Sequence, residues 1–268
     1  MNETTSPAAY DALMAERYDE DFEASFGGRD RGDVAFFRGL AAATAGTICE
    51  VGAGTGRMLL AIAEAVGDDR TLVGVEPSEA MRRRFEDKVL ADPALASRVA
   101  IRFGTFEAIP LPDGAAGLVY AAFRSFQHVL DPAAQLRALI ELQRVLAPGG
   151  VLALDLFDPS YRLLADAGPG RGLRYRTARG TIVERWESRR LRRADQIIEV
   201  TFRWVERRGR KIVKDLSESY AVRYTFPHEL GHLLARAGLE RALIQGDYDG
   251  RPIGEEAREL IVVARKPS

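Results

Sequence analysis

The feature that most limits the fold is an alternation, from about residue 45 onward, of short apolar runs with amphipathic stretches of helical length. Such alternation is typical of βαβ units, whose parallel strands form a sheet covered by helices. The expected strands are residues 47–51, 71–75, 99–103, 117–122, 151–157, 239–245 and 260–265. The expected helices are residues 56–66, 78–90, 132–146 and 227–237. The pattern predicts an α/β fold with a doubly wound, mostly parallel, Rossmann-like sheet of seven strands.

A second pattern interrupts the first after the fifth strand. Residues 168–180 are rich in glycine and arginine, and apolar residues then alternate with polar ones over 198–204 and 216–224. A period of two predicts antiparallel strands with one covered face, and Gly209 is a candidate hairpin tip. We therefore expect three parts, divided as an N-terminal helical cap (1–45), an α/β core (46–165 and 226–268) and an antiparallel β lid (166–225).

Composition excludes several classes of protein. Of the 268 residues 46% are hydrophobic, which is ordinary for a globular chain, and no apolar run reaches the ~20 residues that cross a bilayer. The N-terminus lacks the features of a secretory signal. With Cys49 as the single cysteine, a reducing, cytoplasmic location is expected. Three histidines without ligand spacing, and no CxxC pair, predict that no metal is bound.

The first strand leads into the run Glu50-Val51-Gly52-Ala53-Gly54-Thr55-Gly56. Glycines let the backbone turn tightly against a ligand, and the helix that follows presents free N–H groups. The spacing is one residue shorter than the GxGxxG of dinucleotide-binding proteins. Glu50 would repel a pyrophosphate but attract an ammonium or sulfonium group, and Glu76 ends the next strand, where a carboxylate can accept both ribose hydroxyls.

The segments EVGAGTGR, VGVEPSEAM and RVLAPGGVLALDLF, in this order over residues 47–157, resemble the class I S-adenosylmethionine-dependent methyltransferases of the small-molecule type, with a β-strand lid inserted after strand five. The resemblance implies S-adenosylmethionine as cofactor. It places the methionine part at Glu50 and the loop glycines, the ribose at Glu76, and the adenine beside Pro77 and Met81. The implied set is Glu50, Gly52, Ala53, Gly54, Gly56, Arg57, Glu76, Pro77, Met81, Thr105, Phe106 and Phe123.

Two family motifs depart from the usual pattern. Gly104 is followed by Thr105 and Phe106 where the family usually carries an acid near the adenine amine, so the Phe106 N–H is the expected substitute. Gly117 stands where the fourth motif usually begins with an acid. The backbone carbonyl around Ala122 or Phe123 is then expected to receive the methionine ammonium.

The acceptor is expected at the carboxyl ends of the strands. After strand four, Arg124 and Ser125 are candidate substrate contacts and His128 a candidate general base. The alternatives are a structural histidine at a helix end and an arginine paired with a nearby acid. Tyr10 and Tyr18 resemble tyrosines that such enzymes fold over the cofactor, or they are simply buried by an amphipathic helix.

Three further candidates, Tyr220, Arg223 and Tyr224, alternate along the last lid strand, so that Tyr220 and Tyr224 share one face. This face either lines a pocket or packs against the sheet. Residues 171–214 hold 15 basic and five acidic residues. Arg189, Arg190, Arg192 and Arg193 are expected at a hairpin turn. The basic residues are expected to be solvated or to face a second subunit in a homodimer through the lid; the alternatives are an anionic acceptor and nucleic acid.

These observations predict an S-adenosylmethionine-dependent methyltransferase that acts on an N or O acceptor of a small molecule, with no nucleic-acid or membrane partner. Alignment of the acceptor with an activated methyl group is the main task of such a protein. Two alternatives stay open. One is an RNA methyltransferase that uses the basic lid, and the other is a non-catalytic S-adenosylmethionine-binding partner protein.

Overall fold

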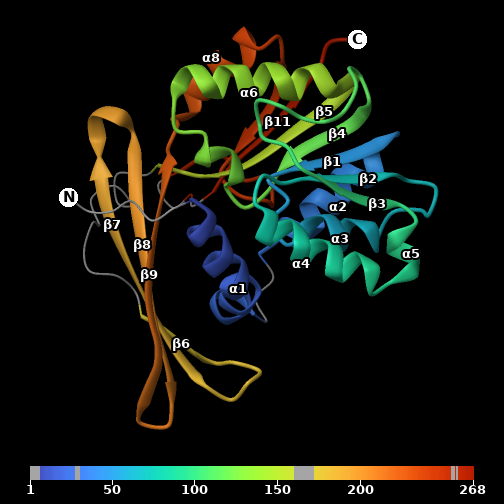
Figure 1. Cartoon of the computed structure of the whole chain (residues 1–268). Helices are drawn as coiled ribbons and strands as arrows, with labels where there is room; N and C mark the ends of the chain where they lie inside the picture. Colours follow the sequence, from blue (N-terminus) through green and yellow to red (C-terminus); the bar gives the residue numbers. More distant parts are fainter. Residues whose placement is uncertain (1–6, 28–30, 160–171, 255–256, 258) are drawn as a thin grey trace. The chain divides into compact units, whose positions relative to one another are not determined.

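The computed structural model describes residues 7–27, 31–159, 172–254, 257 and 259–268 (Figure 1). Contacts divide the chain into two compact units. The small unit comprises Met1–Asp30 and Tyr161–Arg223, and the large unit comprises Arg31–Ser160 and Tyr224–Ser268. The two units are described in turn.

The described residues of the large unit form a seven-stranded sheet in the order β10-β11-β5-β4-β1-β2-β3. Pairing is parallel from β5 through β4, β1 and β2 to β3, while β11 is antiparallel to both β5 and β10. This confirms the predicted doubly wound, mostly parallel sheet. The strands are β1 (Thr47–Val51), β2 (Leu72–Val75), β3 (Val99–Arg102), β4 (Ala116–Ala121), β5 (Leu146–Phe157), β10 (Glu240–Gln245) and β11 (Glu259–Arg265).

Helices cover both faces of this sheet, with α6 and α8 on one face and α3 and α4 on the other (Figure 1). Two separate clusters of buried side chains result, one around Leu139 and Leu142 and the other around Phe37, Leu59 and Phe85. The elements are α2 (Asp33–Ala43), α3 (Arg57–Ala63), α4 (Glu79–Leu90), α5 (Pro93–Ala96), η1 (Ser125–His128), α6 (Pro132–Val145) and α8 (Pro227–Arg236).

Side-chain caps explain where two of these helices begin. The Ser78 hydroxyl accepts a hydrogen bond from the Met81 N–H at 3.2 Å, as predicted for the start of α4. Asp131 likewise caps α6 by accepting from the Ala134 N–H at 2.7 Å.

One boundary differs from expectation. α6 ends at Val145, and β5 already begins at Leu146, before the Pro-Gly-Gly segment that was expected to separate them. Leu146 pairs with Ala116 of β4, and the register then shifts so that Val151 pairs with Leu118. The pairing with β4 therefore starts before the segment, which forms an irregularity inside the strand.

The described part of the small unit holds helix α1 (Pro7–Phe26) and a four-stranded antiparallel sheet in the order β6-β7-β8-β9. Its strands are β6 (Leu173–Arg176), β7 (Ile182–Arg192), β8 (Ile197–Arg208) and β9 (Lys211–Arg223). Gly209, with φ +60°, lies between β8 and β9 and confirms the predicted hairpin tip. Trp204, Val200 and Val222 lie on the covered face of this sheet.

Two predictions about this sheet are wrong. Arg189, Arg190 and Arg192 lie within β7 rather than in a turn, because β7 pairs with β8 as far as Arg192. The turn is the short helix η2 (Arg193–Asp195), which holds only Arg193 of that group. Tyr224 lies beyond the end of β9 and belongs to the large unit, where it packs against Phe226, so Tyr220 and Tyr224 do not share a strand face.

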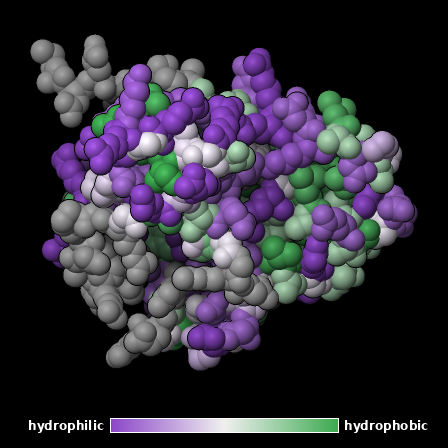
Figure 2. Space-filling view, turned by 90° about the horizontal axis from the view of Figure 1, so that it is seen from below, coloured by the Kyte–Doolittle hydropathy of each residue, from purple (hydrophilic) through white to green (hydrophobic). Residues whose placement is uncertain are grey.

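No helix of the described residues is long and apolar enough to span a membrane. On the face shown in Figure 2, hydrophobic side chains lie in small groups among hydrophilic ones. Scattered groups of this kind are ordinary on protein surfaces.

Candidate active site

The glycine loop joins β1 to α3, and its three glycines have positive φ angles of 77°, 55° and 85° at Gly52, Gly54 and Gly56. An added Cβ would lie 2.6 Å from Ser125 at Gly52 and 2.4 Å from the Phe85 ring at Gly56. Glycine is therefore required at both positions for packing. At Gly54 an added Cβ would meet nothing within 4 Å, so this part of the loop faces open space.

Glu76 fastens the loop to the end of β2. One carboxylate oxygen accepts the Gly54 N–H at 2.9 Å, and the other accepts the Ser78 N–H at 2.9 Å. A carboxylate offers about four acceptor positions. Glu76 can therefore hold the loop and still accept hydroxyl groups, and this geometry fits the 2′ and 3′ hydroxyls of a ribose.

Glu50 is a buried acid at the end of β1, and its carboxylate accepts a hydrogen bond from the Tyr120 hydroxyl at 3.1 Å. Burial raises the pKa of Glu50 to about 8, although Arg57 and the Tyr120 bond oppose this shift. A cation beside the carboxylate would offset the cost of burying its charge. Glu50 therefore fits the ammonium of the methionine part, and the loop fits S-adenosylmethionine as a whole.

The backbone is strained immediately after β4. Phe123 and Arg124 have φ angles of 51° and 69°, which side-chain-bearing residues rarely adopt. Asp155 of β5 holds both: its carboxylate accepts the Phe123 N–H at 2.8 Å, and its carbonyl accepts the Arg124 N–H at 3.0 Å. Strain of this kind is often retained at functional sites, and this turn follows the strand next to the glycine loop.

Asp155 belongs to a buried group of charged and polar side chains. The Tyr248 hydroxyl donates to the same carboxylate oxygen at 2.6 Å, and Arg31 donates to both Tyr248 and Glu259 at 3.3 Å. Arg124 also donates to Glu259, at 3.1 Å. Burial raises the pKa of Asp155 and of Glu259, while the two arginines act in the opposite direction.

This group was not predicted. Asp155 carried a usable signal, because a lone acid within the apolar strand Val-Leu-Ala-Leu-Asp-Leu-Phe is buried only with partners. Tyr248 and Glu259 gave no such sequence signal. Their neighbouring residues form no recognisable motif, and both residues come close to Asp155 only because distant segments of the chain pair in the fold.

The residues predicted after strand four have their own contacts. Arg124 is half-buried and forms an ion pair with Glu259, as in the alternative in which this arginine pairs with a nearby acid. The Ser125 hydroxyl donates to the Ala122 carbonyl at 2.9 Å and lies beside Gly52. His128 is exposed at the end of η1. The acceptor contacts predicted for these three residues stay predictions.

The predicted adenine contacts lie at the ends of β2 and β3. Pro77 is exposed, Met81 is half-buried in the first turn of α4, and Thr105 is exposed in a turn closed by hydrogen bonds with Ala108. Phe106 packs edge-on against Phe126, with ring centroids 5.5 Å apart. The remaining members of the predicted cofactor set, Ala53 and Arg57, are a buried loop residue and an arginine that donates to Asp33 at 2.9 Å.

Four predicted residues belong to the small unit. Tyr18 lies on α1 and is half-buried, and Tyr220 lies on β9 with its ring centroid 5.7 Å from that of Phe202. Arg223 is buried and donates to Gln196 at 3.1 Å. Tyr10 falls within α1, but its side chain lies outside the described residues.

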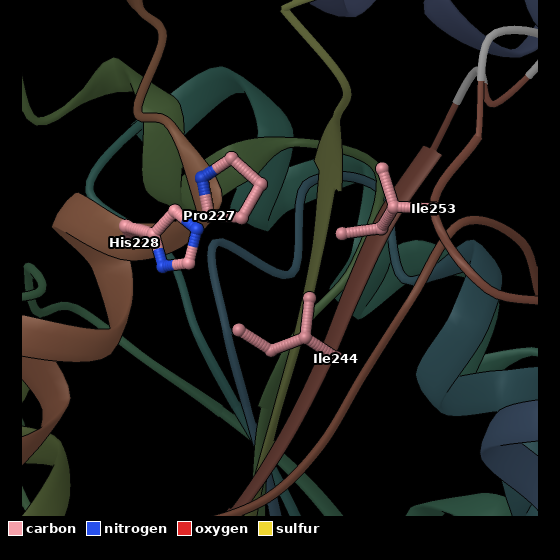
Figure 3. Close-up of a pocket in the computed structure, with 4 residues that line it drawn as sticks. All are labelled: Pro227, His228, Ile244 and Ile253. Carbon is pink, nitrogen blue, oxygen red and sulfur yellow. The ribbon is translucent and has the colours of Figure 1, made fainter.

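A small pocket lies elsewhere in the large unit, between the start of α8 and strand β10 (Figure 3). Pro227, His228, Ile244 and Ile253 surround about 290 Å³. β10 and β1 are separated by β11, β5 and β4, which is roughly 19 Å at the usual strand spacing. The pocket is thus distinct from the glycine loop. Among the described residues, no group of three acids, histidines or cysteines could hold a metal ion.

The sequence matches the methyltransferase domain family over residues 48–150. A ubiquinone/menaquinone biosynthesis C-methyltransferase of Geobacter sulfurreducens is 36% identical over 119 residues, which is 44% of this chain and 44% of that protein. The chain thus matches less than half of that relative. The cypemycin N-terminal methyltransferase of a Streptomyces species is 27% identical, covering 98% of this chain and 99% of its own length.

Two solved structures show the same fold over 94% or more of the chain. The CcbJ methyltransferase of Streptomyces caelestis superimposes with a TM-score of 0.76 at 24% identity, covering 100% of both chains. The sugar N-methyltransferase KedS8 of Streptoalloteichus gives a TM-score of 0.72 at 20% identity, covering 94% of this chain and 93% of its own.

The doubly wound sheet and the acid-flanked glycine loop define a class I S-adenosylmethionine-binding α/β protein. Over residues 48–150 the chain carries a methyltransferase domain, and over its length it is similar to S-adenosylmethionine-dependent methyltransferases. These matches bear out the predicted resemblance and agree with the expected cofactor, and neither the RNA methyltransferase nor the non-catalytic alternative gains support.

Replacing Tyr248 with phenylalanine is expected to weaken both folding and cofactor binding. The change removes the hydroxyl bonded to Asp155, and a hydrogen bond to a charged group contributes about 1.5–3 kcal/mol. With its carboxylate less well held, Asp155 should fix the Phe123 turn less firmly. Urea unfolding and calorimetric titration with S-adenosylhomocysteine measure the two effects.

Tyr175→Phe is the matched control, because the Tyr175 hydroxyl donates to Asp21 at the same 2.6 Å but within the small unit. It should lower stability similarly and leave cofactor affinity unchanged. Equal affinities for both variants would contradict a link between Asp155 and the cofactor site.

Proposed function

We propose that the chain transfers the methyl group of S-adenosylmethionine to an amine nitrogen of a small molecule. The supporting observation is the share of this chain that each similar protein covers. The C-methyltransferase matches 44% of the chain, whereas the cypemycin N-terminal methyltransferase covers 98% and the sugar N-methyltransferase 94%. The resemblance implies that acceptor specificity depends on parts outside the cofactor-binding core. Two of the matches that include those parts, the cypemycin N-terminal methyltransferase and the sugar N-methyltransferase, methylate nitrogen by their names, so nitrogen is favoured over oxygen.

In this proposal the large unit binds the cofactor, whose sulfonium supplies an activated methyl group. Glu50 holds the methionine ammonium, Glu76 accepts the ribose hydroxyls, and Gly54 leaves room for the ligand. The Phe123 turn presents a backbone carbonyl to the ammonium, and Pro77, Met81, Thr105 and Phe106 border the adenine.

The residues predicted from the sequence stay the candidates of this proposal for the acceptor. They are Tyr10 and Tyr18 to exclude water, His128 to take up the proton that the nitrogen loses although desolvation lowers its pKa to about 4, and Ser125, Arg124, Tyr220, Arg223 and Tyr224 to contact the acceptor. An amine attacks through its own lone pair, so orientation contributes more than base strength. The 15 basic residues within 171–214 are compatible with an anionic group on the acceptor or with a homodimer through the small unit.

The test is methyl transfer from labelled S-adenosylmethionine to a panel of small amines, matched alcohols and phenols, and bulk RNA, with products located by mass spectrometry. Label on amines supports the proposal. Label only on alcohols, phenols or RNA, or none on any acceptor, overturns it.

Gly54→Ala provides an inactive variant for this assay. At φ +55° the new Cβ costs about 1–2 kcal/mol and projects into the open space expected to hold the cofactor. Cofactor affinity should fall at least about tenfold, measured by calorimetry. Gly209→Ala, with φ +60° and equally open surroundings, carries the same strain at a hairpin tip and should bind normally. Similar losses in both variants would refute the role of Gly54.

A further inference from the structure

Glu218 is an acid on β9 of the small unit, and its side chain is buried, with 8% of the residue exposed. One carboxylate oxygen, Oε2, is inaccessible and has no hydrogen-bond partner in the structure. Burying an unpaired charge is costly, so such a group is normally paired or waits for a ligand.

The other acids in or beside the same sheet are paired with arginines. Each forms an ion pair with an arginine; they are Glu184, Glu187, Asp195, Glu199, Glu206 and Asp215. Glu218 therefore stands apart in a segment that is rich in arginine, because no ion pair to it is found among the described residues.

Aromatic rings adjoin Glu218 on the same face of the sheet. Phe202 of β8 is its direct cross-strand neighbour, and Tyr220 follows two residues later on β9. The ring centroids of Phe202 and Tyr220 are 5.7 Å apart, and Trp204 lies 5.5 Å from Phe202. A carboxylate beside aromatic rings is a typical receptor for an organic cation, which binds both the charge and the ring faces.

The cationic side chains near Glu218 pair with other acids. The Arg185 guanidinium lies over the Phe202 ring at 4.6 Å, but it is paired with Asp21 at 3.2 Å. Lys214, on the same strand, is bonded to Glu16 at 2.7 Å. Burial also raises the pKa of Glu218, as expected for an acid without a cation beside it.

We propose that Glu218, with Phe202 and Tyr220, binds a protonated amino group of the acceptor. This group is not the nitrogen that receives the methyl group, because a protonated amine has no lone pair with which to attack. The inference rests on the proposed function for the identity of the ligand as acceptor, and it narrows the substrate class to molecules that carry a second, protonated amino group on an apolar or ring-shaped body. The recognition site belongs to the small unit and acts by charge pairing and ring contact alone, without a covalent step.

Both tryptophans of the chain, Trp186 and Trp204, lie in this unit, so intrinsic fluorescence reports on it. Cyclohexylamine, titrated into the full-length protein without cofactor, should give a saturable change, and cyclohexanol should not. Glu218→Gln should weaken the cyclohexylamine response at least tenfold while the melting temperature stays equal or rises, because a buried unpaired charge is removed. Asp215→Asn, on the same strand but exposed and paired with Arg203, is the matched control and should bind like the natural protein.

A response of equal strength in Glu218→Gln, or no difference between cyclohexylamine and cyclohexanol, would overturn the site. The titration contains no cofactor and measures no methyl transfer. Amine binding that depends on Glu218 in a protein that methylates no amine would therefore uphold the site and overturn the proposed function. Amine methylation by a protein whose amine binding does not depend on Glu218 would uphold the proposed function and overturn the site.

Discussion

Glu76→Ala is expected to weaken S-adenosylmethionine binding at least about 100-fold, equivalent to roughly 2.8 kcal/mol. Two effects combine. The carboxylate that would accept the ribose hydroxyls is lost, and hydrogen bonds to a charged group contribute about 1.5–3 kcal/mol each. The Gly54 and Ser78 N–H groups also lose their acceptor, so the loop is held less firmly. Isothermal titration calorimetry with S-adenosylmethionine measures the change directly.

Glu79→Ala is the control for this experiment. Glu79 lies three residues further on, in the first turn of α4, but its side chain is exposed and pairs with Arg83 on the surface. It should bind the cofactor normally. Glu76→Gln should lose nearly as much affinity as alanine, because one carboxylate oxygen becomes an NH₂ group facing a backbone donor. Undiminished binding by Glu76→Ala would exclude the ribose role of Glu76.

Glu50→Gln is expected to stabilise the protein at alkaline pH while weakening cofactor binding. The pKa of Glu50 is raised from an unfolded value near 4.5 to about 8, because burial disfavours the charged carboxylate. Between these values the folded protein holds a proton that the unfolded chain has released. The free energy of unfolding therefore falls as pH rises from about 4.5 to 8, by on the order of several kcal/mol. Glutamine removes this loss and keeps the bond from Tyr120.

Urea unfolding at pH 5 and pH 9 measures the first effect, and calorimetry at pH 8 measures the second. The variant should gain stability relative to the natural protein mainly at pH 9, and its cofactor affinity should drop because the methionine ammonium loses its counter-charge. Glu64→Gln, at an exposed acid paired with Arg38, should change neither quantity. A Glu50→Gln variant that binds S-adenosylmethionine as tightly as the natural protein would contradict the assigned role.

Most of the core could be predicted because its signals are local. The strand that contains Glu50, the glycine loop and the Ser78 cap each occupy consecutive residues, and their spacing reflects the backbone geometry that they adopt. The start of β5 was placed too late, since pairing of Leu146 with Ala116 joins residues 30 positions apart. The arginines of β7 were placed in a turn for a similar reason: charge alone does not reveal that Glu187, Asp195 and Glu199 pair with them.

The sequence by itself determined the order of strands and helices, the loop for S-adenosylmethionine and the interruption by an antiparallel sheet, because periodicity and glycine spacing are properties of neighbouring residues. Only the tertiary structure decided which side chains share a buried environment. Asp155 meets Tyr248 and Glu259 through sheet pairing and a distant loop, and Glu218 lacks the arginine partner that the other acids of its sheet have. Such juxtapositions depend on register and burial across the fold, which one-dimensional patterns do not encode.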